Sequence, residues 1–173
     1  TEILLEAIGE NKDPKLLVET TARVAKSWME LLNGYSLDDR LLYKTFNSYN
    51  DNLIIIKNIK FISICEHHLL PFRGLITIGY RPNKKILGLS KFGRIVDCFA
   101  NRLQLQEKLV NQIGNSIIEN LKPKDLFIVA KAIHDCVICR GIKKENSETI
   151  NFFTYGKYKN YNELDLINSI KTL

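Results

Sequence analysis

Apolar residues recur at two different spacings along this chain and predict helices first and strands afterwards. Asp13 and Pro14 are typical of a helix start, and apolar residues then recur at helical spacing as far as Gly34. We expect this helix to bury one side, formed by Leu17, Val24, Trp28 and Leu31. A second, shorter helix is expected over residues 37–46. Residues 1–50 are therefore predicted to form a helical arm.

The middle of the chain changes from strand patterns to helix patterns. Residues 53–64 are rich in Ile and Phe and predict a strand, followed by strands over 74–80 and 85–87. Ser90 is expected to cap a helix whose apolar side is formed by Phe92, Ile95, Val96, Phe99 and Leu103. A further helix is expected from about Gln106 to Pro123, with Leu109, Ile113, Ile117 and Leu121 on its apolar side.

The last part of the chain completes the predicted domain. A long strand is expected over 126–140, another over 148–153, and a terminal helix over 161–173. This order of helices, strands, two helices and more strands is typical of an α+β fold with an antiparallel sheet. We expect one domain over residues 51–173, preceded by the arm of residues 1–50.

Composition narrows the class of protein. The chain has 173 residues, 45% of them hydrophobic, and its longest apolar runs are strand-sized, so no membrane span is expected. Its charge of +6 favours anionic partners, but the basic residues are scattered rather than gathered into a nucleic-acid-binding stripe. Four Cys in a chain long enough to bury a core indicate reduced thiols or metal ligands, which fits a cytoplasmic protein.

The three His and three of the four Cys fall in two short segments, 65–68 and 134–139. Imidazole and thiolate are ligands that Zn²⁺ prefers, so a zinc site is expected. One alternative is a closed structural site with four ligands, Cys65, His68, Cys136 and Cys139.

We favour an open zinc site formed by Cys65, His68 and Cys136. On the expected strand, Cys136 and Cys139 point to opposite faces, and the two residues between them are poor turn formers. His67 and His134 would then remain as free imidazoles. Three protein ligands and a water are typical of a hydrolytic zinc site.

Two further segments carry polar groups suited to a nucleotide. Ser90, Lys91 and Arg94 lie at an expected helix start, where backbone N–H groups also favour anions, although a cap with surface charges is the commoner interpretation. Arg140 offers another phosphate contact. Gln106 and Glu107 place an amide beside a carboxylate that could bind the N1–H and amino groups of guanine; taken alone, a polar linker is the better interpretation.

Together these segments resemble the GTP cyclohydrolase I family. The resemblance covers about residues 53–156, and its motifs occur in the order that the family has. They are Ser63–Phe72, Gly88–Lys91, Arg94–Asp97, Gln104–Glu107, His134–Cys136 and Arg140–Gly141.

The resemblance implies a tunnel-fold (T-fold) subunit in a homo-oligomer, typically a decamer, with active sites between subunits. It implies conversion of GTP and water to formate and 7,8-dihydroneopterin triphosphate, the first step of folate or tetrahydrobiopterin synthesis. It also implies a cytoplasmic, allosteric enzyme with no nucleic-acid or membrane partner. By position, the resemblance implies that Cys65, His68 and Cys136 are the zinc ligands and that His67 and His134 are the catalytic imidazoles. It implies triphosphate binding by Ser90, Lys91, Arg94 and Arg140. It implies a guanine pocket formed by Leu89, Gln106 and Glu107.

The chain departs from the family at Gly93, at Asn101 and in the tail after Gly156, which lacks a common Arg. Two other hypotheses stay open at this point. A zinc-stabilised nucleic-acid-binding module would use Cys139 as a ligand. A nitrile reductase relative acting on a deazapurine would need a nucleophilic Cys and NADPH.

Overall fold

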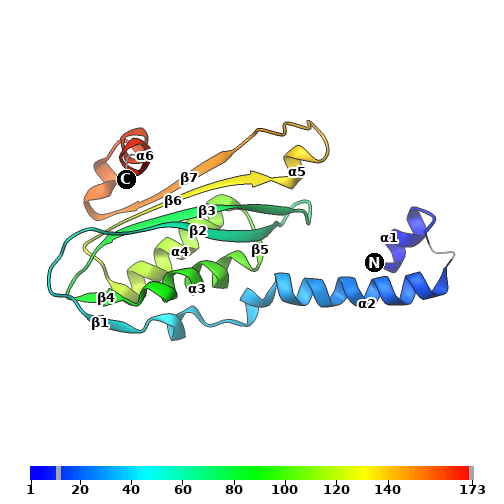
Figure 1. Ribbon diagram of the computed structural model, residues 1–173, viewed down its shortest axis with the longest axis horizontal. Helices are drawn as coiled ribbons and strands as arrows, with labels where there is room; N and C mark the ends of the chain where they lie inside the picture. The colour runs from blue at the N-terminus through cyan, green and yellow to red at the C-terminus, as the bar shows by residue number, and fades with distance from the viewer. Residues whose placement is uncertain (11–12, 172–173) are drawn as a thin grey trace.

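The molecule is built on a five-stranded sheet in the order β5-β2-β3-β6-β7, with helices α3 and α4 packed against one face (Figure 1). The structure, a computed structural model, describes residues 1–10 and 13–171. Strands β2, β3, β6 and β7 pair antiparallel and β5 joins β2 in parallel, so the predicted α+β class is confirmed. The strands are β2 (Ile54–Cys65), β3 (Pro71–Arg81), β5 (Leu103–Gln104), β6 (Asp125–His134) and β7 (Thr149–Tyr155).

The main core lies between the sheet and the two helices, α3 (Leu89–Ala100) and α4 (Gln106–Leu121). Both helices show the predicted apolar sides, because residues three and four apart share a helix face. Ile76 and Ile128 from the sheet and Ile95 and Ile113 from the helices are fully buried here. Removing this apolar surface from water is the main stabilising term.

The ends of these helices differ in part from the prediction. The N-cap of α3 is Gly88, so Ser90 lies inside the helix and is not its cap. The helix ends at Ala100, and Leu103 belongs to β5, where it pairs with Ile64, although its spacing matched the helix. The end of α4 is as predicted, with Lys122 in the left-handed conformation just before Pro123.

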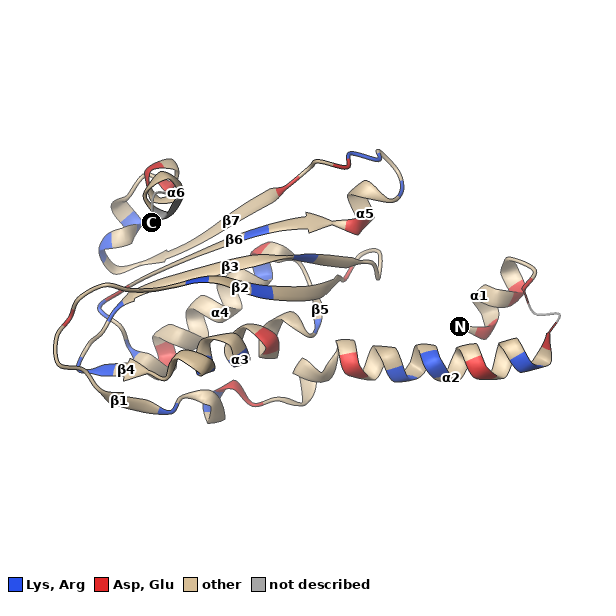
Figure 2. Ribbon diagram, in the orientation of Figure 1, with Lys and Arg blue, Asp and Glu red and all other residues tan. Residues whose placement is uncertain are grey.

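The N-terminal helices α1 (Glu2–Ala7) and α2 (Pro14–Leu31) extend away from the sheet, as Figure 1 shows. Asp13 caps α2 as predicted, its carboxylate accepting from Lys15 N–H at 2.9 Å. No residue of α2 is buried, so the prediction of a core-facing side was wrong for the single chain. Figure 2 shows acidic and basic residues interspersed along α2.

The segment between α2 and β2 is not the short helix expected over residues 37–46. Asp38 accepts from Arg40 N–H and starts a 3₁₀ turn, and Thr45–Asn47 is then drawn into pairing with Lys85–Leu87. Gly34 does not end α2 in a left-handed conformation; a Cβ there would lie 2.5 Å from the carbonyl oxygen of Cys98 in α3. The elements here are η1 (Asn33–Ser36), η2 (Asp39–Leu42), β1 (Thr45–Asn47) and β4 (Lys85–Leu87).

The strand expected over 126–140 ends early, at His134. Pairing with β3 stops at Phe72 and His134, and backbone groups without a strand partner need other hydrogen bonds. The chain forms them by turning into α5 (Asp135–Ile138), with Cys139 N–H donating to the Asp135 carbonyl at 3.0 Å.

The C-terminal part covers one end of the other face of the sheet. It consists of η3 (Gly156–Asn160) and α6 (Glu163–Lys171), so the predicted terminal helix is present, and residues 172–173 lie outside the described chain. Tyr158 and Leu166 pack there against Phe127 in a second, small core. Among the described residues, no helix is both long and apolar enough to cross a bilayer.

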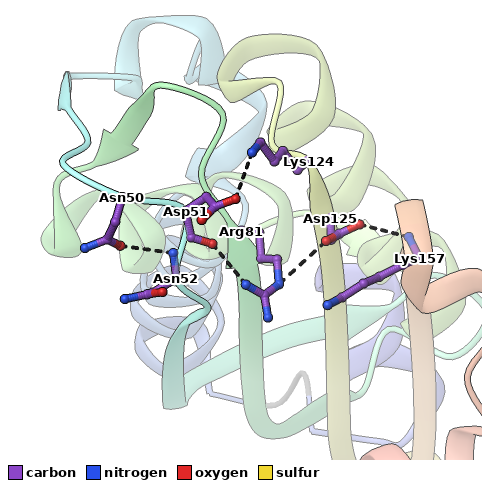
Figure 3. Close-up of polar contacts among 7 residues, drawn as sticks. All are labelled: Asn50, Asp51, Asn52, Arg81, Lys124, Asp125 and Lys157. Carbon is purple, nitrogen blue, oxygen red and sulfur yellow. Dashed lines mark hydrogen bonds and ion pairs between the residues drawn. The ribbon is translucent and has the colours of Figure 1, made fainter.

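A polar network joins four segments at one end of the sheet (Figure 3). Lys124 donates to the Asp51 carboxylate at 2.8 Å, and Arg81 donates to the Asp51 carbonyl at 3.1 Å. Asp125 accepts from Lys157 N–H at 2.9 Å. The network fixes this end of the sheet and leaves the opposite end, where Cys65 lies, for other side chains.

Candidate metal centre and active site

The two segments that carry the His and Cys residues meet at one end of the sheet. Cys65 is the last residue of β2, and the turn that follows folds His68 back over it, with Leu69 in a left-handed conformation and its N–H donating to the Cys65 carbonyl. Register brings in Cys136, because Ile64 lies opposite Pro71 on β3 and Phe72 lies opposite His134 on β6. Cys136 follows directly in α5.

The ligand atoms of Cys65, His68 and Cys136 all lie within 4.8 Å of one another. Cys65 Sγ is 3.6 Å from His68 Nδ1. A thiolate and an imidazole on one tetrahedral zinc ion lie roughly 3.5 Å apart, given bonds of about 2.3 and 2.0 Å. Two sulfurs and one nitrogen are also the donor types that zinc prefers, so this group fits the metal.

The electrostatics of the Cys65 and Cys136 thiols also favour a bound cation. Burial, and then the neighbouring Cys65 thiol, raise the pKa of Cys136 above its ordinary value. Two thiols this close cannot both ionise easily unless a cation lies between them. The arrangement is therefore unfavourable for a dithiolate alone and favourable for a bound divalent ion.

Cys139 does not belong to this group. Within the described chain, the ligand atoms that meet within 4.8 Å come from the other three residues, and Cys139 is exposed. The prediction that Cys136 and Cys139 lie on opposite faces of a strand was wrong, because both residues follow the end of β6, in α5 and at its C-cap.

His134 lies next to the metal ligands, half-buried at the end of β6. Its ring stacks on Phe72, with 4.7 Å between centroids and 4° between planes, and its Nε2 lies 2.8 Å from Gln106 Oε1. Burial lowers the pKa of His134, while the nearby carboxylates of Glu107 and Asp135 oppose that shift. His67 is exposed, with its ring edge-to-face on His68 at 6.1 Å.

Gln106 and Glu107, both expected at a guanine pocket, differ in what they offer. The Gln106 side chain is buried and its amide is bonded to the protein's own atoms. Glu107 is exposed in the first turn of α4, where Asn151 Nδ2 donates to its carboxylate at 3.3 Å. Glu107 is therefore available to a ligand, and Gln106 is not.

The remaining candidates divide between the two ends of the sheet. Arg140 follows α5 and lies close enough to Cys136 to lower its pKa, against the larger effects that raise it. The residues at the start of α3 follow the far end of β3, whose 11 residues span roughly 35 Å. Within one chain, four candidates therefore lie apart from the metal ligands. They are Leu89, Ser90, Lys91 and Arg94.

Sequence reasoning missed two residues that hold the site together. Phe72 stacks on His134, and Asn151 donates to Glu107 from β7. Phe72 was visible only as part of a motif, and Asn151 had no local signal because its contact depends on the register of β6 with β7.

Comparison with known proteins supplies the family. The family model described as GTP cyclohydrolase I matches residues 1–168. The chain belongs to this family. GTP cyclohydrolase 1 of Wolinella succinogenes is 40% identical over 158 residues, covering 90% of this chain and 84% of the relative. GTP cyclohydrolase 1 of Clostridium kluyveri is 43% identical over 159 residues, covering 91% and 86%.

A solved structure supports the fold. The apo crystal structure of the archaeosine synthase QueF-Like matches with a TM-score of 0.50 at 18% identity, covering 60% of this chain and 93% of that one. The sheet with two packed helices is thus a T-fold, as the resemblance implied. Membership in the GTP cyclohydrolase I family favours that enzyme over the nucleic-acid module and the nitrile reductase.

Proposed function

We propose that this chain converts GTP and water to formate and 7,8-dihydroneopterin triphosphate, with zinc held by Cys65, His68 and Cys136. The observation that carries the proposal is the meeting of these three ligands with His134 at one end of a T-fold sheet, in a chain of this family. Bound there, zinc would act as a Lewis acid and make hydroxide available near neutral pH. Such a reaction is the first step of folate or tetrahydrobiopterin synthesis.

The protein's own groups suit the attack on guanine. His134 lies two residues from Cys136, and in this proposal it protonates N7, which makes C8 electrophilic. Hydrolysis at C8 opens the imidazole ring to a formamide, and a second water releases formate. The ribose then rearranges and closes onto the freed amine with loss of one water, so one water is consumed overall. His67 would carry protons near the sugar.

Glu107 supports the choice of GTP over ATP. Its exposed carboxylate can accept hydrogen bonds from N1–H and the 2-amino group of guanine. Adenine presents N1 as an acceptor and would leave that carboxylate unpaired, which is a strong basis for rejection. Leu89 of a neighbouring copy of the chain would contact the base in the same pocket.

The position of the triphosphate-binding candidates supports a site shared between two copies of the chain. Arg140 lies near the metal ligands, whereas the N-terminal end of α3 lies at the far end of β3. In this proposal a neighbouring subunit supplies Ser90, Lys91 and Arg94, and the chain assembles into a homodecamer. Residues 51–173 form the catalytic domain and residues 1–50 the arm. The reduced thiols of such a site suit the cytoplasm.

Incubation of the zinc-loaded protein with GTP tests the proposal. We expect stoichiometric formate and, after oxidation, a fluorescent pterin, with neither product from ATP. His134→Ala should keep zinc and GTP binding but lose formate release by about 10²- to 10⁴-fold, the usual contribution of a general acid. Near-normal turnover of this variant would remove His134 from the chemistry, and absence of formate from the wild-type protein would refute the activity.

A further inference from the structure

Every polar hydrogen-bonding group of the Gln106 side chain is engaged within the protein. Its Nε2 donates to the carbonyl of Ala130 at 3.1 Å and to that of Thr149 at 3.0 Å. Its Oε1 lies 2.8 Å from His134 Nε2. The residue is 1% exposed, so it presents no group to a ligand.

These contacts settle which way the amide points. Backbone carbonyls only accept hydrogen bonds, so the atom that faces Ala130 and Thr149 must be the NH₂ group. The oxygen therefore faces His134, and an amide oxygen can only accept. His134 Nε2 must carry the hydrogen, and in the neutral ring Nδ1 carries the lone pair.

Phe72 fixes the remaining freedom of the imidazole. Its ring lies parallel to that of His134, so the ring plane is set by the stack and the rotation within that plane by Gln106. A ring held at both its face and its Nε2 has one nitrogen left for a substrate. That nitrogen is Nδ1.

We propose that Gln106 is a positioning residue that holds His134 as the Nε2–H tautomer, so that Nδ1 exchanges the proton with the bound purine. The inference rests on the proposed function for the identity of that purine. In the protonated ring, Nδ1–H donates its proton to guanine N7 while Nε2–H stays bonded to Gln106, and Nδ1 regains a proton from solvent. The family resemblance instead implies that Gln106 binds guanine, and the two roles predict different measurements.

Kinetics separate the two roles. Gln106→Met keeps an unbranched side chain of similar length but removes the acceptor. We expect its kcat for formate release to fall by about 10- to 100-fold, the range for outer partners that orient a functional imidazole. The dissociation constant for GTP should stay within about twofold, because Gln106 touches no substrate. A weakened GTP affinity with kcat retained would overturn the proposal.

Two further variants guard against a purely structural effect. Gln106→Glu, held neutral by its buried position, still offers an oxygen to Nε2–H and a hydroxyl to one carbonyl, so most of the kcat should return. If Gln106→Met does not fold, the kcat of Gln106→Glu tests the proposal in its place. In a His134→Ala background, Gln106→Met should cause no further loss of activity. A full additional loss there would place Gln106 in some other role.

Nitrogen NMR of the zinc-loaded protein reads the tautomer without any turnover. The chain has three His, and loss of a signal pair in His134→Ala assigns that residue. We expect a protonated Nε2 and an unprotonated Nδ1 in the neutral ring. The Nε2–H proton should exchange slowly with water in the wild type and in Gln106→Glu, and at least tenfold faster in Gln106→Met. A protonated Nδ1 with a bare Nε2 would contradict the inference even if GTP is turned over, and the expected spectrum would stand even if GTP is not the substrate.

Discussion

The thiols of Cys65 and Cys136 lie close together in the candidate metal centre, so zinc binding there would depend on pH. Because burial and Cys65 raise the pKa of Cys136, the thiol of Cys136 keeps its proton at neutral pH in the metal-free chain. Zinc binds thiolate, so its binding would release this proton. Lowering the pH therefore favours the metal-free form, and raising the pH favours the bound form.

The apparent zinc affinity should accordingly rise with pH by up to about tenfold per unit for each proton released. Competition with a chelator between pH 6 and 8, corrected for the chelator's own titration, measures this slope. A zinc affinity that does not change with pH would contradict the assignment of Cys136 as a ligand whose thiol is protonated in the metal-free protein.

Zinc content distinguishes the open site from a closed one. Cys136→Ser should lose most of the bound zinc, because it removes one of the three ligands that meet within 4.8 Å. Cys139→Ser is the matched control, and it should keep one zinc ion per chain because Cys139 lies outside the group. Equal loss of zinc in both variants would support a four-ligand structural site.

Among individual residues, the sequence predicted those that meet through a short turn. Cys65 and His68 are three positions apart at the end of a strand, so their meeting could be foreseen. The approach of Cys136 depends on the register of β2, β3 and β6, which no local pattern carries. The contacts of Gln106 also come from two strands distant in sequence, β6 and β7, and its spacing beside Glu107 suggested a ligand instead.

Two helical glycines show how packing decides the effect of a substitution. A Cβ at Gly114 in α4 would lie 2.5 Å from the Phe153 ring on β7, whereas a Cβ at Gly93 in α3 would meet nothing within 4 Å. The same change from glycine to alanine should therefore act in opposite directions in the two helices.

We expect Gly114→Ala to lower the free energy of unfolding by about 1–3 kcal/mol, since it overpacks a filled core. Gly93→Ala should raise that free energy by up to about 1 kcal/mol through improved helix propensity. Denaturant unfolding of both variants against the wild type measures the difference. A stabilised Gly114→Ala would mean that α4 can move away from β7 at little cost.

For the helices and strands, periodicity predicted type better than it predicted ends. The apolar sides of α3 and α4 were correct because both helices bury one face against the sheet. Leu103 kept the helical spacing but pairs with Ile64, and residues 37–46 gave way to strand pairing with β4. In these cases a tertiary partner overrides the local preference. The strand expected over 126–140 ends early, at His134, where its pairing with β3 stops at Phe72.

The single chain carries its candidate groups at two opposite ends of the sheet. The metal ligands, His134 and Glu107 lie at one end, and the start of α3 lies at the other. Sequence motifs alone cannot show this separation, because motifs that serve one kind of site need not lie close together within one chain. The separation is the physical reason to expect sites that form only between copies.

Mixed oligomers test this arrangement. Lys91→Ala removes a candidate group at one end of the sheet, and His134→Ala removes one at the other end. Each variant alone should therefore release little formate at low GTP. If two chains share each site, random assembly of equal amounts gives about a quarter of the sites two intact halves. Formate release should then recover to about a quarter of the wild-type rate. A mixture of His134→Ala with Cys136→Ser, both damaged at the same end, should recover nothing, and equal failure of both mixtures would argue for a site within one chain.

The helix α2 carries the chain's one tryptophan, Trp28, which is only partly covered. Indole emission shifts to shorter wavelength as water leaves its surroundings. The emission of Trp28 therefore reports whether the arm of residues 1–50 contacts another copy of the chain. Dilution of the assembled protein should shift this emission to longer wavelength.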